Sequence, residues 1–266
     1  MAKVRLDALL ARRGLFESRS RAAASVMAGD VLLGAGRTPA AKPGQLVDDR
    51  VEVDVRERPA YVSRGGVKLA NALARTGIDV SGRRALDVGA ATGGFTDCLL
   101  SNGATSVIAL DVAYGELDWR LRNDPRVTVI ERCNVRHLTP ERLPYRPDMA
   151  TIDVSFISLA KVLAPVLACL AEAFDCLALI KPQFEVGRGR VGRGGVVRDP
   201  AVRREALSEV AETARALDAS VLGFAPSGLP GPKGNVETFV WLAEPGRAGG
   251  AGGSADVTAM AAEADP

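Results

Sequence analysis

The fold is decided by Arg84-Ala-Leu-Asp-Val-Gly-Ala-Ala-Thr-Gly-Gly-Phe-Thr-Asp97, an apolar run that gives way to glycines and then to a helical pattern. This order predicts a strand, a tight loop and the start of a helix. Gly89, Gly93 and Gly94 have no Cβ, so the loop can adopt positive φ angles and a small molecule can approach its main chain closely. The stretch therefore predicts a cofactor-binding loop.

The glycine spacing and two acidic residues indicate which cofactor this loop holds. The spacing is Gly-x-x-x-Gly-Gly, whereas a dinucleotide site has Gly-x-Gly-x-x-Gly and a P-loop continues into Gly-Lys-Ser/Thr. Asp87 at the strand end would repel a phosphate but suits an ammonium group. Asp111 ends the next apolar run, where nucleotide-binding folds place the acid that binds ribose hydroxyls. The loop alone would fit an ordinary turn, but a ribose, a positive charge and no phosphate together indicate S-adenosylmethionine.

The chain beyond residue 84 alternates between strand-like and helix-like segments. Helical stretches such as 95–101 and 201–217 separate apolar runs near Ala85, Val107, Val127, Met149, Cys176, Val221 and Val236. This alternation predicts an α/β fold, a doubly wound Rossmann-like parallel sheet whose ligands lie beyond the carboxyl ends of the strands.

Charged residues lie at those strand ends. Asp153 and Lys181 each directly follow an apolar strand, and Glu237 lies at the start of the final one. A charge in such a place is costly unless it is paired or used. With Lys68, from a predicted helix over 67–76, they would form a set of two ammoniums and two carboxylates.

Methyl transfer to a ribose hydroxyl needs such a set, since the hydroxyl proton must leave as the methyl group arrives. Lys181 could serve as the base only in its neutral form, which burial beside a second ammonium, Lys68, would favour. Asp153 and Glu237 would then orient the lysines. The same spacing fits two ordinary surface ion pairs equally well.

The beginning of the chain is basic. Residues 1–47 carry eight Lys and Arg residues against three acids, a net charge of +5, whereas the whole chain carries +2. Short helices over 6–15 and 18–28 and strands over 31–33 and 51–55 predict a small α+β module. Clustered arginines on such a module indicate contacts with an RNA backbone. The alternative is a solvated helix face.

Composition shifts divide the chain into four segments. We expect an RNA-binding domain over 1–58, a proline-stiffened linker over 59–62 and a methyltransferase domain over 63–244. The Gly- and Ala-rich stretch 245–266 predicts a disordered tail.

Several classes of protein are disfavoured by the sequence. It has neither a secretory leader nor an apolar stretch suited to a membrane, so we expect a cytoplasmic protein without membrane contact. His137 has no partner at zinc-ligand spacing, and we expect no metal and a monomer. The cysteines form no Cys-x-x-Cys pair, which predicts buried free thiols at Cys98, Cys133, Cys169 and Cys176.

Four motifs resemble the TlyA family of ribosomal RNA methyltransferases: Gly89-Ala-Ala-Thr-Gly-Gly-Phe95, Asp153-Val-Ser-Phe-Ile-Ser-Leu159, Lys181-Pro-Gln-Phe-Glu-Val-Gly187 and Leu229-Pro-Gly-Pro-Lys-Gly-Asn-Val-Glu237. The resemblance runs from Lys3 to about Leu242. It implies an FtsJ-like 2′-O-methyltransferase domain joined to an N-terminal alpha-L RNA-binding motif. The implied substrate is cytidine ribose in 16S and 23S ribosomal RNA of assembled subunits, a modification linked in the family to sensitivity to capreomycin-type antibiotics.

The resemblance also implies site residues. The family's catalytic tetrad corresponds to Lys68, Asp153, Lys181 and Glu237. We expect the S-adenosylmethionine site to comprise Asp87, Gly89, Ala90, Ala91, Thr92, Gly93, Gly94, Asp111, Asp153 and Phe156. The sequence departs from the family in its linker, where Arg-Ala-Trp-Val is replaced by Pro59-Ala-Tyr-Val62.

RNA contacts are expected in both parts of the chain. The glycine- and arginine-rich loop 187–195 follows Lys181 and could grip phosphates, although such a loop alone also fits a disordered surface segment. Tyr114 offers a ring for stacking on a displaced base, unless it is a core or pocket-wall residue. The expected RNA-binding residues are Arg5, Arg12, Arg19, Arg21, Lys42, Arg64, Tyr114, Arg136 and Arg188.

Rival functions would need other features. An amino-group methyltransferase uses Asp/Asn-Pro-Pro-Tyr/Phe, but the corresponding stretch is Asp153-Val-Ser-Phe156, and none of the cysteines follows a proline as expected of a cytosine C5 enzyme. A non-catalytic RNA-binding factor for ribosome assembly is disfavoured by the intact tetrad. A membrane-lytic haemolysin is disfavoured by the lack of a spanning or strongly amphipathic apolar segment.

Overall fold

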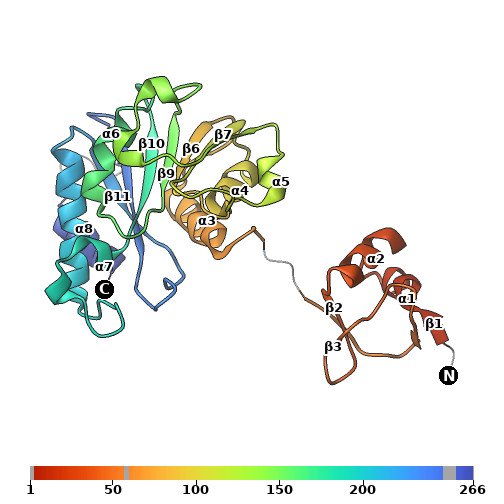
Figure 1. Cartoon of the computed structure of the whole chain (residues 1–266). Helices are drawn as coiled ribbons and strands as arrows, with labels where there is room; N and C mark the ends of the chain where they lie inside the picture. The colour runs from red at the N-terminus through yellow and green to blue at the C-terminus, as the bar shows by residue number, and fades with distance from the viewer. Residues whose placement is uncertain (1–2, 57–59, 248–255, 266) are drawn as a thin grey trace. The chain divides into compact units, whose positions relative to one another are not determined.

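The computed structural model describes residues 3–56, 60–247 and 256–265, with only the backbone of Arg188 included. The chain divides into two compact units, Met1–Pro59 and Ala60–Pro266 (Figure 1). Each unit has its own apolar core, and we describe the two separately.

The N-terminal unit is α+β, as predicted. Strand β1 pairs with β4, and β2 pairs with both β3 and β5, all antiparallel. Helices α1 and α2 close over these strands with Leu6, Leu10, Ala22 and Val26 buried. The side chain of Ser18 caps α2 by accepting a hydrogen bond from the backbone of Arg21. The elements are β1 (Lys3–Arg5), α1 (Leu6–Arg12), α2 (Arg19–Met27), β2 (Val31–Leu33), β3 (Thr38–Pro39), β4 (Leu46–Asp48) and β5 (Val53–Val55).

The second unit contains the doubly wound sheet. Within the described residues it has seven strands in the order β11-β12-β10-β9-β6-β7-β8. Strand β12 is antiparallel to both neighbours, because the short connection from β11 leaves no room for the helical crossover that a parallel strand needs. The strands are β6 (Arg84–Val88), β7 (Ser106–Leu110), β8 (Val127–Ile130), β9 (Met149–Ile152), β10 (Asp175–Ile180), β11 (Ser220–Pro226) and β12 (Thr238–Ala243).

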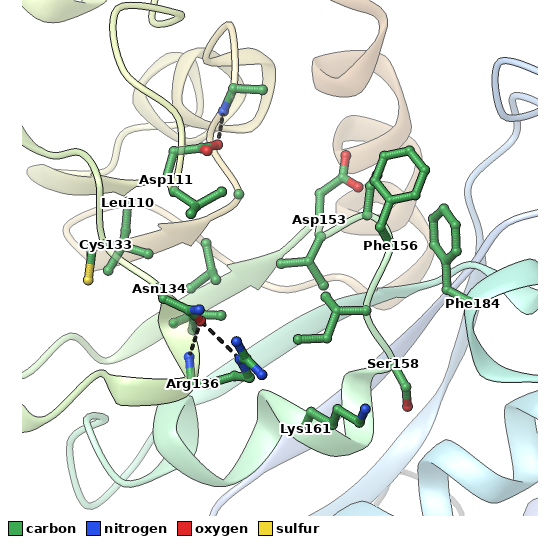
Figure 2. A pocket seen from close by; sticks show the side chains of 18 of the residues that line it. Leu110, Asp111, Cys133, Asn134, Arg136, Asp153, Phe156, Ser158, Lys161 and Phe184 are labelled. Atoms are coloured by element: carbon green, nitrogen blue, oxygen red, sulfur yellow. Dashed lines mark hydrogen bonds between the residues drawn. The ribbon is translucent and has the colours of Figure 1, made fainter.

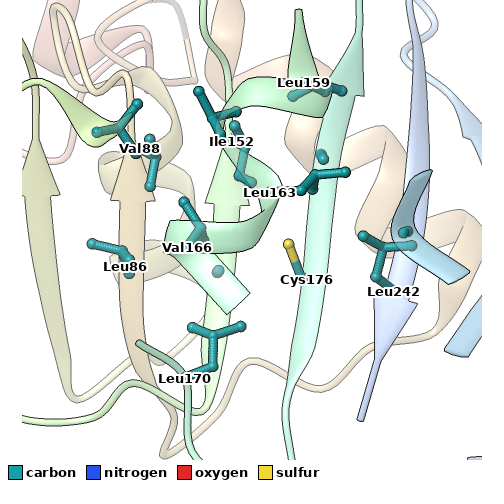
Figure 3. Close-up of a cluster of buried hydrophobic side chains, with 14 of the residues drawn as sticks. Leu86, Val88, Ile152, Leu159, Leu163, Val166, Leu170, Cys176 and Leu242 are labelled. Carbon is teal, nitrogen blue, oxygen red and sulfur yellow. The ribbon is translucent and has the colours of Figure 1, made fainter. Parts of the chain in front are cut away.

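Helices cover both faces of this sheet (Figure 1). Side chains alternate along β6, so Leu86 and Val88 join one apolar cluster and Ala85 joins the other. Figure 3 shows the first cluster, in which Leu163 and Val166 of α6 pack across the central strands. The helices are α3 (Arg64–Thr76), α4 (Gly94–Ser101), α5 (Trp119–Arg122), α6 (Leu163–Leu167), α7 (Pro182–Glu185), α8 (Pro200–Arg215) and α9 (Val257–Ala264).

Short 3-10 turns complete the unit: η1 (Val135–His137), η2 (Pro140–Arg142), η3 (Leu159–Lys161) and η4 (Arg188–Arg190). The four cysteines are buried and free, which confirms the prediction of buried thiols. In the part of the chain that the structure describes, no helix is long and apolar enough to cross a membrane. The same residues contain no group of three or more His, Cys, Asp or Glu that could hold a metal ion.

The C-terminal segment differs from the prediction. A disordered tail was expected over 245–266, but residues 257–264 form α9, which packs against α8 and β11. Val257 and Ala261 are buried there, and Asp265 accepts hydrogen bonds of 2.6 and 2.8 Å from the guanidinium of Arg203. The prediction was wrong for this helix because it rested on the Gly- and Ala-rich composition of the segment, whereas Val257 and Ala261 find a packing partner only in the folded unit. Residues 248–255 lie outside the described residues.

This helix should contribute measurably to stability. The Arg203–Asp265 side chains are 12% and 6% exposed, so Asp265→Ala leaves a largely buried cation unpaired. We expect a loss of about 2–3 kcal/mol in unfolding free energy and a fall of roughly 5–10 °C in melting temperature. Glu263→Ala is the matched control on the same helix, because its pair with Arg75 is exposed and worth below about 1 kcal/mol. Equal effects of the two substitutions in thermal unfolding would contradict a stabilising role for the buried pair.

Candidate active site

The glycine loop connects β6 to α4 at the carboxyl edge of the sheet. Gly89 and Gly93 have φ angles of 84° and 94°, which favour glycine. A Cβ at Gly89 would also collide with the backbone oxygen of Asp153, and one at Gly94 would collide with Ser63. A Cβ at Gly93 would meet Leu121. The lack of side chains at these glycines therefore allows neighbouring segments to pack closely against the loop, and it also leaves the main chain of the loop accessible.

A cavity of about 910 Å³, here called the loop cavity, lies beside this loop (Figure 2). Asp111 borders it directly after β7, as the sequence predicted, and its carboxylate accepts hydrogen bonds from the backbone of Ala91 (2.8 Å) and Ala113 (2.7 Å). These bonds fix the acid at the rim of the cavity. Its lining also includes Val88, Gly89, Val112, Cys133, Asn134, Val135, Arg136, Asp153 and Phe156.

Asp87 occupies a different place from the one expected. Its side chain is fully buried beneath the loop and lines none of the cavities described here. It accepts hydrogen bonds from the hydroxyls of Thr96 (2.7 Å) and Thr151 (3.1 Å). Burial raises the pKa of Asp87 to about 7, against an ordinary value of 3.8. Asp87 therefore ties the start of α4 to β9 from below.

The four tetrad residues all border one cavity of about 500 Å³, here called the lysine cavity. The ammonium of Lys68 pairs with the carboxylate of Glu237, and both side chains are buried. The Nζ atom of Lys181 lies 2.5 Å from Oδ1 of Asp153 and donates to the hydroxyl of Ser155 over 3.0 Å. Residues from α3, from the ends of β9 and β10 and from just before β12 thus meet at one place.

Asp153 is the point where the cavities meet. It borders the loop cavity, the lysine cavity and a third cavity of about 330 Å³. Lys68 borders both the third cavity and the lysine cavity. The third cavity is also lined by Ser63, Arg64, Gly65, Gly89, Ala90, Ala91, Thr92, Gly94 and Phe95. The glycine loop and the lysines therefore face connected space, while Gly93 and Asp87 support the loop from behind.

Phe156 and its loop were only partly anticipated. Phe156 has a φ of 64°, an unusual value for an aromatic residue, and is 92% exposed beside both the loop and lysine cavities. Its ring centroid lies 5.2 Å from that of Phe184 (Figure 2). Glu185 accepts from the hydroxyl of Ser158 (2.6 Å) and the backbone of Leu159 (3.0 Å). These bonds and the Asp153–Lys181 pair hold the loop at both ends, which offsets the backbone strain.

Sequence reasoning did not single out Ser155, Glu185 and Phe184 as site residues. All three lie inside motifs already quoted for the family resemblance, so those motifs were the available signal. Burial raises the pKa of Glu185, partly offset by its bond from Ser158. What the motifs could not give was the pairing of Glu185 with the loop that follows β9.

The expected RNA-binding residues whose side chains the structure describes lie at the surface. Arg5, Arg12, Arg19, Arg21 and Lys42 are exposed in the N-terminal unit. In the second unit, Arg64 borders the third cavity and donates to the carbonyl of Pro230 over 2.9 Å, and Arg136 borders the loop cavity.

Tyr114 and Arg188 were also expected to contact RNA. Tyr114 is exposed, with the guanidinium of Arg132 4.3 Å from its ring centroid, and it lines none of the three cavities. The side chain of Arg188 lies outside the described residues.

The fold and site define a class of protein. A glycine loop after β6, an acid after β7 and charged residues after β9 and β10 describe a Rossmann-like methyltransferase. Fibrillarin from Aeropyrum pernix, solved with S-adenosyl-L-methionine, shares this fold with a TM-score of 0.50 at 15% identity, covering 73% of this chain and 90% of its own.

Comparison with known proteins identifies the family. The FtsJ-like methyltransferase family matches residues 61–244. The chain is 48% identical over 243 residues to the 16S/23S rRNA (cytidine-2′-O)-methyltransferase TlyA of Mycobacterium tuberculosis, covering 90% of each chain. A solved structure described as a candidate hemolysin from Streptococcus thermophilus is 38% identical, with a TM-score of 0.72 and coverage of 99% and 96%.

The chain therefore belongs to the FtsJ-like methyltransferases of the TlyA family, as the four motifs predicted, and it is an enzyme.

The buried acid beneath the loop predicts a pH dependence of stability. Because the folded pKa of Asp87 is raised above 3.8, folding takes up a proton between about pH 4 and pH 7, and this contribution to stability is lost as the pH rises through 7. In urea unfolding, Asp87→Asn should reduce the loss of stability between pH 5 and pH 8 by roughly 1–3 kcal/mol. Glu116→Gln, at an exposed acid, should not. If Asp87→Asn leaves the pH dependence of the unfolding free energy unaltered, ionisation of Asp87 does not destabilise the folded protein, which contradicts the prediction.

Proposed function

We propose that this protein transfers the methyl group of S-adenosylmethionine to the ribose 2′-hydroxyl of cytidine in 16S and 23S ribosomal RNA. The observation that carries the proposal is the lysine cavity, where Lys68 pairs with Glu237 and Lys181 with Asp153, joined at Asp153 to the loop cavity. The name of the 48% identical relative supports the substrate. The family resemblance further supports a link to capreomycin sensitivity, which we include in the proposal.

The loop cavity suits the proposed cofactor. Gly89 and Ala91 present open main chain on one side, and Asp111 is already oriented by two backbone donors for a ribose. Asn134 borders the same space, and its side-chain oxygen accepts from the backbone of Arg136. A bound S-adenosylmethionine would supply an electrophilic methyl group on a positively charged sulfur. Its charge would be balanced by the carboxylate of Asp153 at the junction of the cavities.

The lysines would perform the proton transfer. A ribose hydroxyl is a poor nucleophile until its proton is removed, and Lys181 is the base in this proposal. When the hydroxyl oxygen takes the methyl group that the cofactor would supply, the hydroxyl proton would pass to Nζ of Lys181. Asp153 and Ser155 orient that amine. Lys68 borders the same cavity, and its pair with Glu237 keeps it in place.

RNA would be held by basic residues of both units. The exposed arginines of the N-terminal unit and those of the loop around η4 would contact phosphates. In that loop, Arg190 is already paired with Glu205. In this proposal the protein acts as a monomer in the cytoplasm, where ribosomal subunits are found, and it needs no metal.

Labelled-methyl transfer to purified ribosomal subunits, followed by nucleoside mass spectrometry, tests the proposal. We expect 2′-O-methylcytidine from both subunits. A methylated base would contradict the chemistry, and binding to subunits without transfer would favour an assembly factor. Release of calcein from liposomes tests the membrane-lytic alternative that the names of some relatives suggest.

Two substitutions of Lys181 distinguish a role as the catalytic base from a role as a positive charge. Lys181→Ala should lower the rate of methyl transfer by about 100- to 10,000-fold while leaving affinity for S-adenosylmethionine nearly intact. Lys181→Arg keeps the charge beside Asp153 but supplies a group that is not deprotonated in proteins, so it should be equally inactive. Single-turnover transfer and calorimetric cofactor binding measure the two effects. An active Lys181→Arg variant would exclude the base assignment.

Removal of residues 1–58 tests the role assigned to the N-terminal unit. Because arginine contacts with phosphates release counterions, the truncated protein should bind ribosomal subunits more weakly, with a salt slope reduced by roughly 2–4. Binding measured across a series of salt concentrations gives both quantities, and cofactor affinity of the truncated protein is the control. An unchanged slope would remove the N-terminal unit from the RNA footprint.

A further inference from the structure

One acidic residue lies among the basic residues of the N-terminal unit. Asp7 is in the first turn of α1, and its side chain is only 7% exposed. It accepts hydrogen bonds from the backbone of Ala8 (2.7 Å), from Nε and Nη2 of Arg5 (3.2 and 2.8 Å) and from Nη2 of Arg19 (3.4 Å). The guanidinium of Arg5 lowers the pKa of Asp7 to about 2, so the carboxylate is charged at neutral pH.

Each of the two guanidiniums contacts Asp7 with some of its N–H groups and remains accessible to solvent with the others. The two arginine side chains remain 53% and 59% exposed. Nη1 of Arg5 makes no hydrogen bond to Asp7, and neither do Nε and Nη1 of Arg19. Each guanidinium therefore retains N–H groups that can donate hydrogen bonds to a phosphate. Arg5 ends β1 and Arg19 begins α2, so a single carboxylate brings guanidiniums from two elements together.

The backbone beneath Arg5 is shaped to fit it. A Cβ at Gly44 would lie 3.1–3.2 Å from three guanidinium atoms of Arg5, so the glycine leaves just enough room for the side chain. Arg5 is therefore held by Asp7, and the lack of a side chain at Gly44 leaves room for its guanidinium. By contrast, Arg13 donates to the backbone carbonyls of Asp49 and Val51 and serves the fold of the unit.

We propose that Asp7 is a positioning residue that holds Arg5 and Arg19 as a preformed two-guanidinium site for an RNA phosphate. The inference rests on the proposed function of the N-terminal unit. Long cationic side chains lose conformational freedom when they bind, and Asp7 restricts two of them before the RNA arrives. Its charge alone would weaken RNA binding, since it repels phosphates. If Asp7 positions the arginines, removal of its charge should weaken RNA binding. If Asp7 acts only as a negative charge, removal should strengthen RNA binding.

Asp7→Asn in the full chain tests this difference. Asparagine keeps an acceptor for the backbone of Ala8 but loses the charge that holds the arginines. We expect affinity for ribosomal subunits to fall about 3- to 10-fold, seen as a higher KM for RNA, with kcat and cofactor affinity unchanged. Glu17→Gln is the matched control, because it removes the same charge from an exposed site in the same unit. It should leave the affinity equal or increased. Equal or tighter binding by Asp7→Asn would overturn the proposal.

A double-mutant cycle separates positioning from a general effect on folding. In an Arg5→Ala/Arg19→Ala background, Asp7→Asn should cause no further loss of affinity if Asp7 acts through the two arginines. A further loss there, or a lower thermal unfolding temperature that accounts for the weaker binding, would overturn the proposal. If Arg5→Ala/Arg19→Ala itself leaves affinity unchanged, these two arginines form no phosphate site and the proposal fails, while removal of residues 1–58 decides the RNA role of the whole unit. If the double substitution weakens binding and Asp7→Asn does not, only the role of Asp7 fails.

Discussion

The geometry of the candidate active site depends on the contact between Asp153 and Lys181. Strands β9 and β10 are parallel neighbours, with Ile152 opposite Ala178, so the residues that follow them emerge at the same edge of the sheet. The 2.5 Å ion pair joins these two ends. Because the backbone oxygen of Asp153 also lies where a side chain at Gly89 would be, the same residue sets the distance between the glycine loop and the lysines. The register of β9 with its two neighbours therefore positions both the glycine loop after β6 and Lys181 after β10.

The site contains groups that the fold alone would not require. A carboxylate is buried beneath the loop at Asp87, and the Lys68–Glu237 pair is almost wholly removed from solvent. A buried ion pair is weak evidence for stability, because well-packed apolar residues of similar size often stabilise a protein as much or more. The Lys68–Glu237 pair borders a cavity, and its presence there is better explained by chemistry, whereas Asp87 supports the loop. The surrounding sheet, buried on both faces, supplies the stability that these groups do not.

Both units use carboxylates to orient cations. Asp153 and Ser155 hold the ammonium of Lys181 in one unit, and Asp7 holds two guanidiniums in the other. In the proposed reaction the first arrangement faces a ribose hydroxyl and the second faces phosphates. An acid that appears unfavourable for binding a polyanion can assist it when it limits the freedom of flexible cations. Counting charges along the chain does not detect this, because it treats Asp7 only as a charge that weakens the basic surface.

The sequence by itself determined the glycine loop, the position of Asp111 after a strand and the strand order along the chain, and it singled out four charged residues that border one cavity, since each depends on local pattern or on a motif. Only the tertiary structure decided that Asp87 lies beneath the loop, that Glu237 precedes β12 and that α9 covers α8 and β11. It also decided the pairing of Lys68 with Glu237, 169 residues apart. The reason is physical: periodicity and motifs report a residue's neighbours along the chain, whereas burial and charge pairing depend on which segments the sheet brings together.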